Sequence, residues 1–480
     1  MSRVISIATG KRMEANAVAS PTHNLSQFIS QIEFGDLPSE LRSSLNKFFL
    51  DTVGCGLYGI TTRSGRILAE QALEKGGKEE ASLWGHGWRG PLESIGLCLG
   101  TWIHAYELDD YHSGAKLHPG GPVFAAAIPL AEFLGTDGKS FVTAVAAGYE
   151  TMIRASLAAG SIPVRKRGFH LTGICGTFGA AAAACRLFGL GPETTANALG
   201  LAGTQSAGLW AFNCDGSETK RFHGGRAAQA GLLAADLARR GYTGPRQIFE
   251  FGDGGFFSAF SSDEGDHTLL TKGLGTHWEA INTSIKPYCC CGSVHSTIDA
   301  ILDLRKKYTL KPEEIEEIEI FNHSVVERQC SWKYEPLTTL NAQMNIEYCA
   351  AVALTDGAAG PAQFSEERFS DSVIVDLAQK AHFTIDPEIE KKYPYTFPGK
   401  TTIRTKSGKT YTSYQEGPKG SPQNPMQPNE VVEKFRWVTE PVIDEELQTY
   451  LIEISQRLGE LDSLAPVVSR LAAPFSEAEM

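Results

Sequence analysis

Apolar residues in the first half of the chain have the spacing of amphipathic helices. Between residues 25 and 239 they recur three or four positions apart, which places them on one face of a helix. One such set is Leu41, Leu45, Phe48, Phe49 and Val53. Three alanine-rich segments, whose small side chains suit closely crossing helices, follow at residues 124–133, 141–152 and 178–188. Because strand-like alternation is scarce, this half is predicted to be mostly helical, whereas residues 1–22 are expected to lack regular structure.

The apolar pattern changes near residue 273. Residues 313–326 alternate between apolar and polar in the manner of a half-buried strand. Residues 401–414 are typical of a hairpin with Ser407-Gly408 as its turn. Helical spacing is found again in three segments, residues 294–308, 348–356 and 429–471.

These patterns divide the chain into three segments. Residues 23–275 would form the first part of a helical domain, residues 276–415 an α+β domain, and residues 416–475 a helical return to the first domain. The predicted fold class is therefore mainly α, with a large all-helical domain built from both chain ends and an inserted α+β domain.

The chain is acidic. Its 480 residues include 44 Lys and Arg against 56 Asp and Glu, which gives a net charge of −12. Nucleic acid is not an expected partner, because no basic stripe is present to neutralise phosphates. No apolar run approaches the roughly 20 residues that cross a bilayer, so a membrane role is not expected either.

The cysteines and the N-terminus bear on location. Ten cysteines are scattered along the chain, apart from three in a row at residues 289–291. Scattered cysteines without a secretory signal predict reduced thiols and a cytoplasmic protein. Arg3, Lys11 and Arg12 precede the first acid, Glu14, which leaves a mitochondrial presequence as the alternative.

Acids and histidines gather in residues 107–121. The segment reads Glu-Leu-Asp-Asp-Tyr-His and continues through Lys116 and His118 to two glycines. Such a group can supply a general acid and base, while N–H groups at the start of the next helix hold a carboxylate. Helix capping by Asp, with histidines at the surface, is the alternative interpretation.

Two further segments place a histidine near the start of an alanine-rich helix. His170 lies in a glycine-rich turn at residues 168–173, where it either faces a ligand or belongs to a structural loop. Residues 218–226 gather three cations, among them Lys220, with a histidine. Cations are disfavoured at a helix N-terminus, so this cluster suggests a polyanionic ligand, and a solvated helix start is the alternative.

The segment at residues 286–295, KPYCCCGSVH, combines cysteines with a histidine. Consecutive cysteines do not easily reach one ion, and no C-x-x-C or H-E-x-x-H spacing occurs, so no metal is predicted. Lys286 is the better candidate, as a cation that binds a carboxylate. Without a Walker loop or a G-x-G-x-x-G that follows a strand, no nucleotide cofactor is predicted.

Together these segments resemble the MmgE/PrpD family over about residues 25–471. The most specific pieces are ELDDYHSGAKLHPG, GFHLTGICGTFGAAAAA, TKRFHGGRAAQAGLLAADLARRGYTG and KPYCCCGSVH. The family includes 2-methylcitrate dehydratases, cis-aconitate decarboxylases and an iminodisuccinate epimerase. ELDDYHS, the cysteine-containing piece and QFSE at residues 363–366 are most similar to fungal cis-aconitate decarboxylases.

The resemblance implies a homodimer. Each subunit would carry an α+β lid domain over an active site between the two domains, with no metal and no organic cofactor. The catalytic histidines of the family correspond to His118 and His170, and its substrate-facing lysines correspond to Lys220 and Lys286.

Other assignments from the resemblance are less direct. An acid of the first motif corresponds to Asp109 or Asp110, and a tyrosine of the lid domain corresponds to Tyr348. Tyr111 and His112 are candidate substrate-binding residues in a part of the motif where animal decarboxylases carry a threonine and a loop one residue shorter.

The implied function is that of a cofactor-independent lyase acting on a small polycarboxylic acid. Local motif similarity favours decarboxylation of cis-aconitate to itaconate. Dehydration of 2-methylcitrate or a related alkylcitrate is the alternative, followed by epimerisation or isomerisation of a dicarboxylate and by non-enzymatic polycarboxylate binding.

Overall fold

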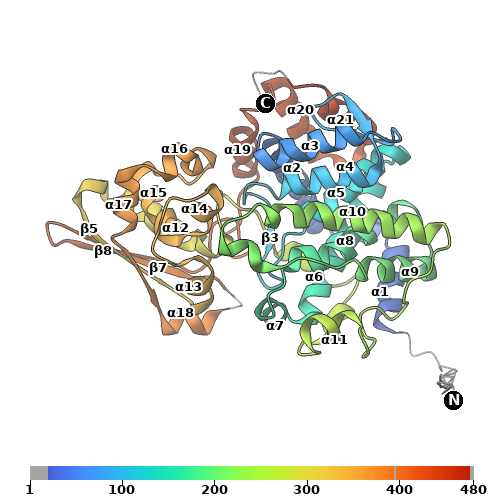
Figure 1. Cartoon of the computed structure of the whole chain (residues 1–480), viewed down its shortest axis with the longest axis horizontal. Helices are drawn as coiled ribbons and strands as arrows, with labels where there is room; N and C mark the ends of the chain where they lie inside the picture. The colour runs from blue at the N-terminus through green and yellow to red at the C-terminus, as the bar shows by residue number, and fades with distance from the viewer. Residues whose placement is uncertain (1–19, 394–395, 476–480) are drawn as a thin grey trace, which may run out of the picture.

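The computed structural model describes residues 20–393 and 396–475, which form two lobes (Figure 1). The larger lobe is helical, and the smaller one contains a four-stranded sheet with helices packed against it. The prediction of a mainly α fold with a small sheet-containing domain is confirmed. Among the described residues, no helix is both long and apolar enough to cross a membrane.

Closely crossing helices form the core of the larger lobe. They are α4 (Leu92–Ile103), α5 (Gly120–Leu134), α6 (Gly138–Ala159), α8 (Leu171–Leu187) and α10 (Thr219–Arg239). The alanine-rich α8 is buried from Leu171 to Cys185. Where α4 and α10 cross, a Cβ on Gly225 would lie 2.1 Å from the carbonyl oxygen of Leu97, so only glycine fits. This close crossing places the first turn of α10 near the end of α4.

Early and late parts of the chain meet in the helical lobe. Helices α19 (Pro428–Thr439) and α20 (Glu445–Gln456) pack on α2 (Ser39–Ile60), and α21 (Ala465–Ala472) packs on α5. Figure 1 shows these late helices, in red, beside the blue early ones. The helical lobe is therefore built from the early helices together with the last helices of the chain.

The first described helix, α1 (Pro21–Gln31), corrects one expectation. The Ser20 hydroxyl accepts a hydrogen bond from the His23 N–H and caps this helix, and Thr22 is buried. The expected lack of regular structure over residues 1–22 is therefore wrong for residues 21–22, which belong to α1. The rest of that expectation, and the alternative of a presequence, fall on residues 1–19, which lie outside the described residues.

The sheet of the smaller lobe has the order β6-β5-β7-β8. Its strands are β5 (Ile315–Asn322), β6 (Ala381–Ile385), β7 (Gly399–Thr405) and β8 (Thr410–Gln415). β5 and the β7–β8 hairpin match the predicted strands, and β6 pairs parallel to β5. β6 escaped prediction because it is an edge strand that buries only Ala381, so it lacks apolar alternation.

Helices α12 (His295–Tyr308) and α15 (Ile346–Asp356) pack on this sheet and on each other. Near the boundary between the lobes, β3 (Tyr111–His112) pairs antiparallel with β4 (Thr283–Ser284) (Figure 1). The remaining helices and strands are α3 (Arg63–Lys75), β1 (Ala81–Leu83), β2 (Trp88–Gly90), α7 (Ser161–Lys166), α9 (Pro192–Gly203), α11 (Phe256–Ser261), α13 (Ser324–Cys330), α14 (Thr339–Met344), α16 (Glu366–Phe369), α17 (Ser372–Ala378) and α18 (Pro387–Lys392).

Candidate active site

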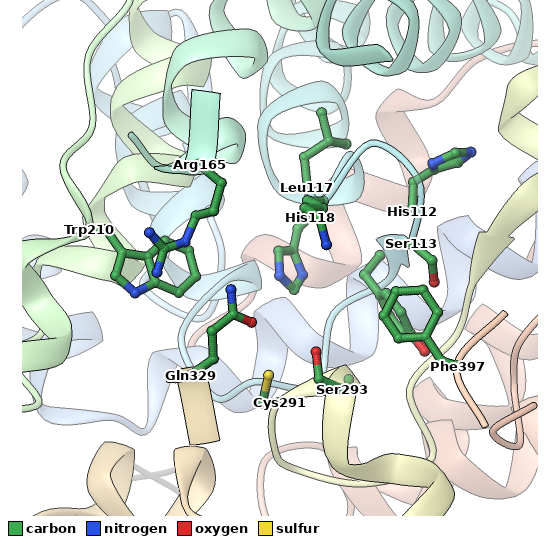
Figure 2. A pocket seen from close by; sticks show the side chains of 13 residues that line it. His112, Ser113, Leu117, His118, Arg165, Trp210, Cys291, Ser293, Gln329 and Phe397 are labelled. Carbon is green, nitrogen blue, oxygen red and sulfur yellow. The ribbon is translucent and has the colours of Figure 1, made fainter. Parts of the chain in front are cut away.

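A solvent-open cavity lies between residues of the two lobes (Figure 2). From the helical lobe it is lined by β3, the loop that follows, Arg165 of α7 and Trp210. From the other side it is lined by residues 291–293, Gln329 of α13 and Phe397. The described lining contains cations, histidines and neutral donors but no Asp or Glu. Such a lining suits an anionic ligand.

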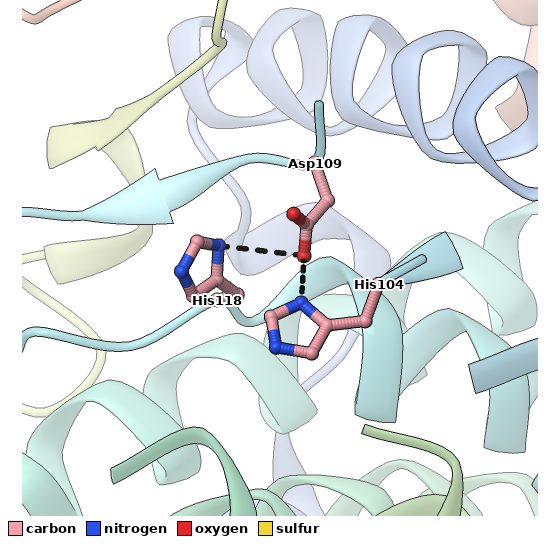
Figure 3. Close-up of side chains that lie close together, drawn as sticks. All are labelled: His104, Asp109 and His118. Atoms are coloured by element: carbon pink, nitrogen blue, oxygen red, sulfur yellow. Dashed lines mark hydrogen bonds and ion pairs between the residues drawn. The ribbon is translucent and has the colours of Figure 1, made fainter. Parts of the chain in front are cut away.

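His118 belongs to this lining, and a carboxylate lies behind its ring (Figure 3). Nδ1 of His118 is 3.3 Å from Oδ2 of Asp109, and Nδ1 of His104 is 2.6 Å from the same oxygen. Nδ1 of His118 is also 2.9 Å from the carbonyl oxygen of Asp110. Two acceptors at Nδ1 place the proton of the neutral ring there, so Nε2, which points away from Asp109, carries the lone pair. His118 is therefore equipped to exchange a proton through Nε2.

The chain between α4 and α5 folds tightly to bring these groups together. Glu107 has a φ of 57°, a left-handed conformation that is uncommon for a residue with a Cβ and recurs at functional sites. The N–H of Gly120, in the first turn of α5, donates to Oδ1 of Asp110 over 2.9 Å. The diglycine therefore does open the next helix, but its N–H binds a carboxylate of the protein itself.

Lys434 of α19 also supports this loop, from the C-terminal part of the chain. Its Nζ donates to the carbonyl oxygen of Leu108 over 2.7 Å and lies 2.5 Å from Oδ1 of Asp51 in α2. All three residues are buried. The late helices therefore hold the segment from which Glu107 and Asp109 project.

The neighbouring acids Asp109 and Asp110 lie in opposite environments. The two imidazoles beside Asp109 hold the pKa of its carboxyl well below the usual range, despite full burial. Burial raises the pKa of Asp110 to about 8, although the Tyr149 hydroxyl donates to it over 2.7 Å. The sequence left the choice between the two acids open. The structure places Asp109 beside His118 and gives Asp110 a contact to helix α5 and to Tyr149.

Lys220 and Lys286 lie behind the cavity and share one carboxylate. Nζ of Lys286 is 3.2 Å from Oε2 of Glu107 and 3.8 Å from Oδ1 of Asp109, and Lys220 forms an ion pair with Oε1 of Glu107. All four side chains are buried, and the two cations lower the pKa of Glu107 against the effect of burial. Lys220 lies within the first turn of α10 rather than before it. Neither lysine is among the residues that line the cavity.

His170, the residue that precedes α8, is also set back from the cavity lining. Its ring stacks on His104 at 5.7 Å between centroids, and its Nδ1 is 2.9 Å from Nδ1 of His223. Burial, followed by the neighbouring imidazoles, pushes the pKa of His170 well below the usual range. His118, His104, His170 and His223 therefore form a line of neighbouring rings that begins at the cavity.

The other predicted residues divide into two groups. Tyr111 and His112 line the cavity, and burial raises the pKa of Tyr111 to about 12, so its hydroxyl stays protonated. Nδ1 of His112 accepts a hydrogen bond from the Ala115 N–H over 3.0 Å. Tyr348 is buried in the smaller lobe, where its hydroxyl donates to the Gln363 carbonyl oxygen, and it does not line the cavity.

Sequence reasoning missed His104, Arg165, Trp210 and Gln329. The first was a single histidine at the end of an apolar helix, a position that carried no signal. Arg165 is part of a basic run, Arg-Lys-Arg, that is typical of a solvated surface. Gln329 and Trp210 come from distant parts of the chain, and only the tertiary fold brings them to the cavity.

His104, Asp109 and His118 are also a group of described residues whose potential ligand atoms lie close enough to share a metal ion, within 4.8 Å of one another. Two features argue for a hydrogen-bonded triad instead. Both Nδ1 atoms already face the same carboxylate oxygen, and the Lys286 ammonium lies 3.8 Å from the other one, where it would repel a cation.

Comparisons with known proteins agree with the sequence resemblance. Models of the MmgE/PrpD N-terminal and C-terminal domains match residues 23–268 and 288–460. Cis-aconitate decarboxylase of Aspergillus terreus is 28% identical over 97% of this chain and 99% of the relative. A cis-aconitate decarboxylase-like protein, oryM, of Aspergillus oryzae is 28% identical over 94% and 96%, and human cis-aconitate decarboxylase is 25% identical over 95% and 95%. Because the two domain models together cover most of its length, the chain belongs to the MmgE/PrpD family.

Proposed function

We propose that this protein is a cofactor-independent lyase that decarboxylates cis-aconitate to itaconate. The observation that carries the proposal is His118, held through Nδ1 by Asp109 at the wall of a cavity without lining acids. Relatives that match nearly the whole chain are named cis-aconitate decarboxylases, which supports the same reaction. The reaction needs one well-placed proton donor and positive charge near the substrate, and neither requires a bound cofactor.

The proposed reaction shifts two pairs of electrons along three carbons. The bond between the CH₂ arm and its carboxylate breaks, and CO₂ leaves without that electron pair. The pair forms the new terminal double bond, while the electrons of the former double bond move to the carbon beside the other terminal carboxylate. That carbon takes a proton from Nε2 of His118, which gives itaconate and a neutral imidazole.

The buried ionic groups next to His118 have no net charge while the His118 ring is neutral. Lys220 and Lys286 carry two positive charges, and Glu107 and Asp109 carry two negative ones. A proton on His118 therefore gives the cluster one net positive charge next to the carbon skeleton that becomes negative. Preorganised charge of this kind can supply much of the rate enhancement, because water is largely excluded from buried groups. In this proposal the two lysines act on the substrate through that field.

The protonation of His118 must depend on the ligand. In the free protein, burial lowers the pKa of His118 to about 4, so its ring is neutral near pH 7. A bound trianion would favour the imidazolium form and raise that pKa. Substrate would then recruit the proton that it later receives on carbon.

The same low pKa favours one alternative. A neutral His118 has a free lone pair on Nε2 and can act as a base, as dehydration of 2-methylcitrate or another alkylcitrate requires. In that reaction the base removes a proton next to a carboxylate, and an acid protonates the hydroxyl that leaves as water.

Proton NMR with chelator-treated protein separates the two reactions. The protein is incubated in turn with cis-aconitate and with 2-methylcitrate. The vinyl protons of itaconate report decarboxylation, and the change of the methyl signal of 2-methylcitrate from a doublet to a singlet reports loss of water. Itaconate formed from cis-aconitate supports the decarboxylase. Loss of water from 2-methylcitrate, with cis-aconitate at most rehydrated, supports the dehydratase, and turnover of neither rejects both.

A further inference from the structure

Two cations that the proposed reaction does not use face the cavity directly. Arg165 and Lys116, here called the cavity cations, are half-buried and line it. Figure 2 shows Arg165 beside Trp210. The guanidinium carbon of Arg165 is 3.6 Å from the centroid of the Trp210 ring, which holds the planar group in place. Its Nε atom is buried and has no hydrogen-bond partner among the described residues. A buried donor without a partner is costly unless a ligand supplies the acceptor.

Lys116 completes the arrangement from the loop after β3. Its ammonium group contacts the Tyr393 hydroxyl and lies 4.5 Å and 5.9 Å from the ring centroids of Tyr393 and Phe397. The residue has a φ of 54°, so the backbone adopts an uncommon conformation at this position. No carboxylate of the described residues forms an ion pair with Lys116 or with Arg165.

Positive charge extends from the cavity into a neighbouring groove. A second groove shares Arg165, Lys116 and Gln329 with the cavity and adds Lys166 and Arg328. No Asp or Glu lines either space within the described residues. Burial lowers the pKa of Lys116 to about 8 and that of Arg165 to about 10, and the neighbouring Cys291 thiol opposes this shift only in part. An anion bound between Lys116 and Arg165 would stabilise their charged forms and raise both pKa values.

We propose that Arg165 and Lys116 form a carboxylate-binding subsite on the Trp210 side of the cavity, and that this subsite selects tricarboxylates over dicarboxylates. The guanidinium fork can bind the two oxygens of one carboxylate, and Lys116 adds a second positive charge. The inference rests on the proposed function and extends it, because it assigns a place to a carboxylate away from the reacting carbon. His118 and its neighbours are then left to act on that carbon.

Calorimetric binding of unreactive ligands tests the subsite. We would titrate the protein and the Arg165→Gln variant with propane-1,2,3-tricarboxylate, with glutarate, which lacks the central carboxylate, and with 2-methylsuccinate, which lacks a terminal one. Loss of a charge-assisted contact predicts a Kd for the tricarboxylate about 10- to 100-fold higher in the variant. At least one dicarboxylate, the one without the carboxylate that Arg165 binds, should have nearly the same Kd in both proteins.

Matched variants separate a specific contact from general attraction. Arg167→Gln removes the same charge two residues away, where the guanidinium contacts Ser262 and the Ala259 carbonyl oxygen outside the cavity. This control should keep the Kd of the unsubstituted protein. Arg165→Lys keeps the charge but not the fork, and should weaken tricarboxylate binding by an intermediate amount.

The inference is overturned if all three ligands lose the same affinity in Arg165→Gln, if none loses affinity, or if Arg167→Gln has the same effect. Lack of tricarboxylate binding by the unsubstituted protein also overturns it. The proposed reaction is judged separately by the NMR assay. Itaconate formation with an unchanged Kd in Arg165→Gln would reject only the subsite, and selective tricarboxylate binding without turnover would reject only the reaction.

Discussion

The buried lysines and the cavity cations differ in what surrounds their charge. Lys220 and Lys286 are almost inaccessible and share Glu107 as a partner. Arg165 and Lys116 lie against aromatic rings at the cavity, without a carboxylate. A buried charge needs a partner within the protein, whereas a half-buried one can receive its partner from a ligand. The difference suggests that the first pair maintains the electrostatic field and the second pair binds the substrate.

The largest effect is expected when the charge-balanced cluster is broken. His118→Ala removes the proton donor. Lys220→Ala leaves Glu107 with Lys286 as its remaining partner and removes one positive charge from the cluster. Each should abolish turnover of cis-aconitate while circular dichroism still reports a folded protein. Activity near that of the unsubstituted protein in either variant would reject the assignment.

A double variant sharpens this test. Lys220→Ala combined with Glu107→Gln removes one positive and one negative charge and so restores the balance. If Lys220 acts mainly through its field and its partner, the double variant should be more stable to heat than Lys220→Ala alone. Equal melting temperatures of the single and the double variant would show that the ion pair with Glu107 does not account for the contribution of Lys220 to stability.

The next largest effect is expected for Asp109→Asn, which should lower kcat about 10²- to 10⁴-fold. The carboxylate orients the imidazole of His118 and stabilises its charged form. The comparison variant is Asp110→Asn, which keeps the shape of a side chain that contacts Gly120 and Tyr149. It should change kcat by less than about threefold, since this carboxyl is already neutral near pH 7. Similar losses in both variants would mean that the two acids are not functionally distinct.

Arg165→Gln should affect steady-state kinetics differently from the cluster variants. A residue that holds a carboxylate equally in the ground and transition states raises KM and leaves kcat nearly unchanged. We therefore expect KM for cis-aconitate to rise about 10- to 100-fold, whereas Asp109→Asn lowers kcat. A fall in kcat without a change in KM would place Arg165 in the chemical step instead.

Proton uptake on binding reports the state of His118. The pKa of its imidazole is about 4 in the free protein, so at pH 6 the ring is neutral until an anion binds and raises that pKa. Titration with propane-1,2,3-tricarboxylate in buffers of different ionisation enthalpy should show an uptake approaching about one proton per site. His118→Gln should remove most of this uptake, and the same uptake in that variant would contradict the assignment.

A last prediction concerns stability rather than activity. The pKa of Asp110 is raised from 3.8 to about 8, so between these values the folded protein holds a proton that the unfolded chain has lost. Its contribution to stability therefore falls as the pH rises through this window, by at most about 1.4 kcal/mol per pH unit. Asp110→Asn should gain melting temperature relative to the unsubstituted protein between pH 5 and pH 8. A constant difference would contradict the raised pKa.

The sequence predicted the fold class because helical periodicity extends through the first half and through the tail. It predicted β5 and the β7–β8 hairpin from apolar alternation, and it missed β6, whose side chains are mostly exposed. Within the site, His118 could be named from its motif. The sequence could not show whether Lys220 faces a substrate or pairs with Glu107, because Glu107 lies 113 residues away in the chain. Asp109 and Asp110 are adjacent and chemically identical, and only their three-dimensional environments separate them.

Decarboxylation in D₂O tests the proposed role of His118 as proton donor. Chelator-treated protein would be incubated with cis-aconitate, and the products would be followed by proton NMR, with the His118→Ala variant in parallel. We expect itaconate with a single deuterium on its saturated methylene carbon, formed by the unsubstituted protein and not by the variant. Unchanged or merely hydrated cis-aconitate, or equal turnover by His118→Ala, would contradict the account.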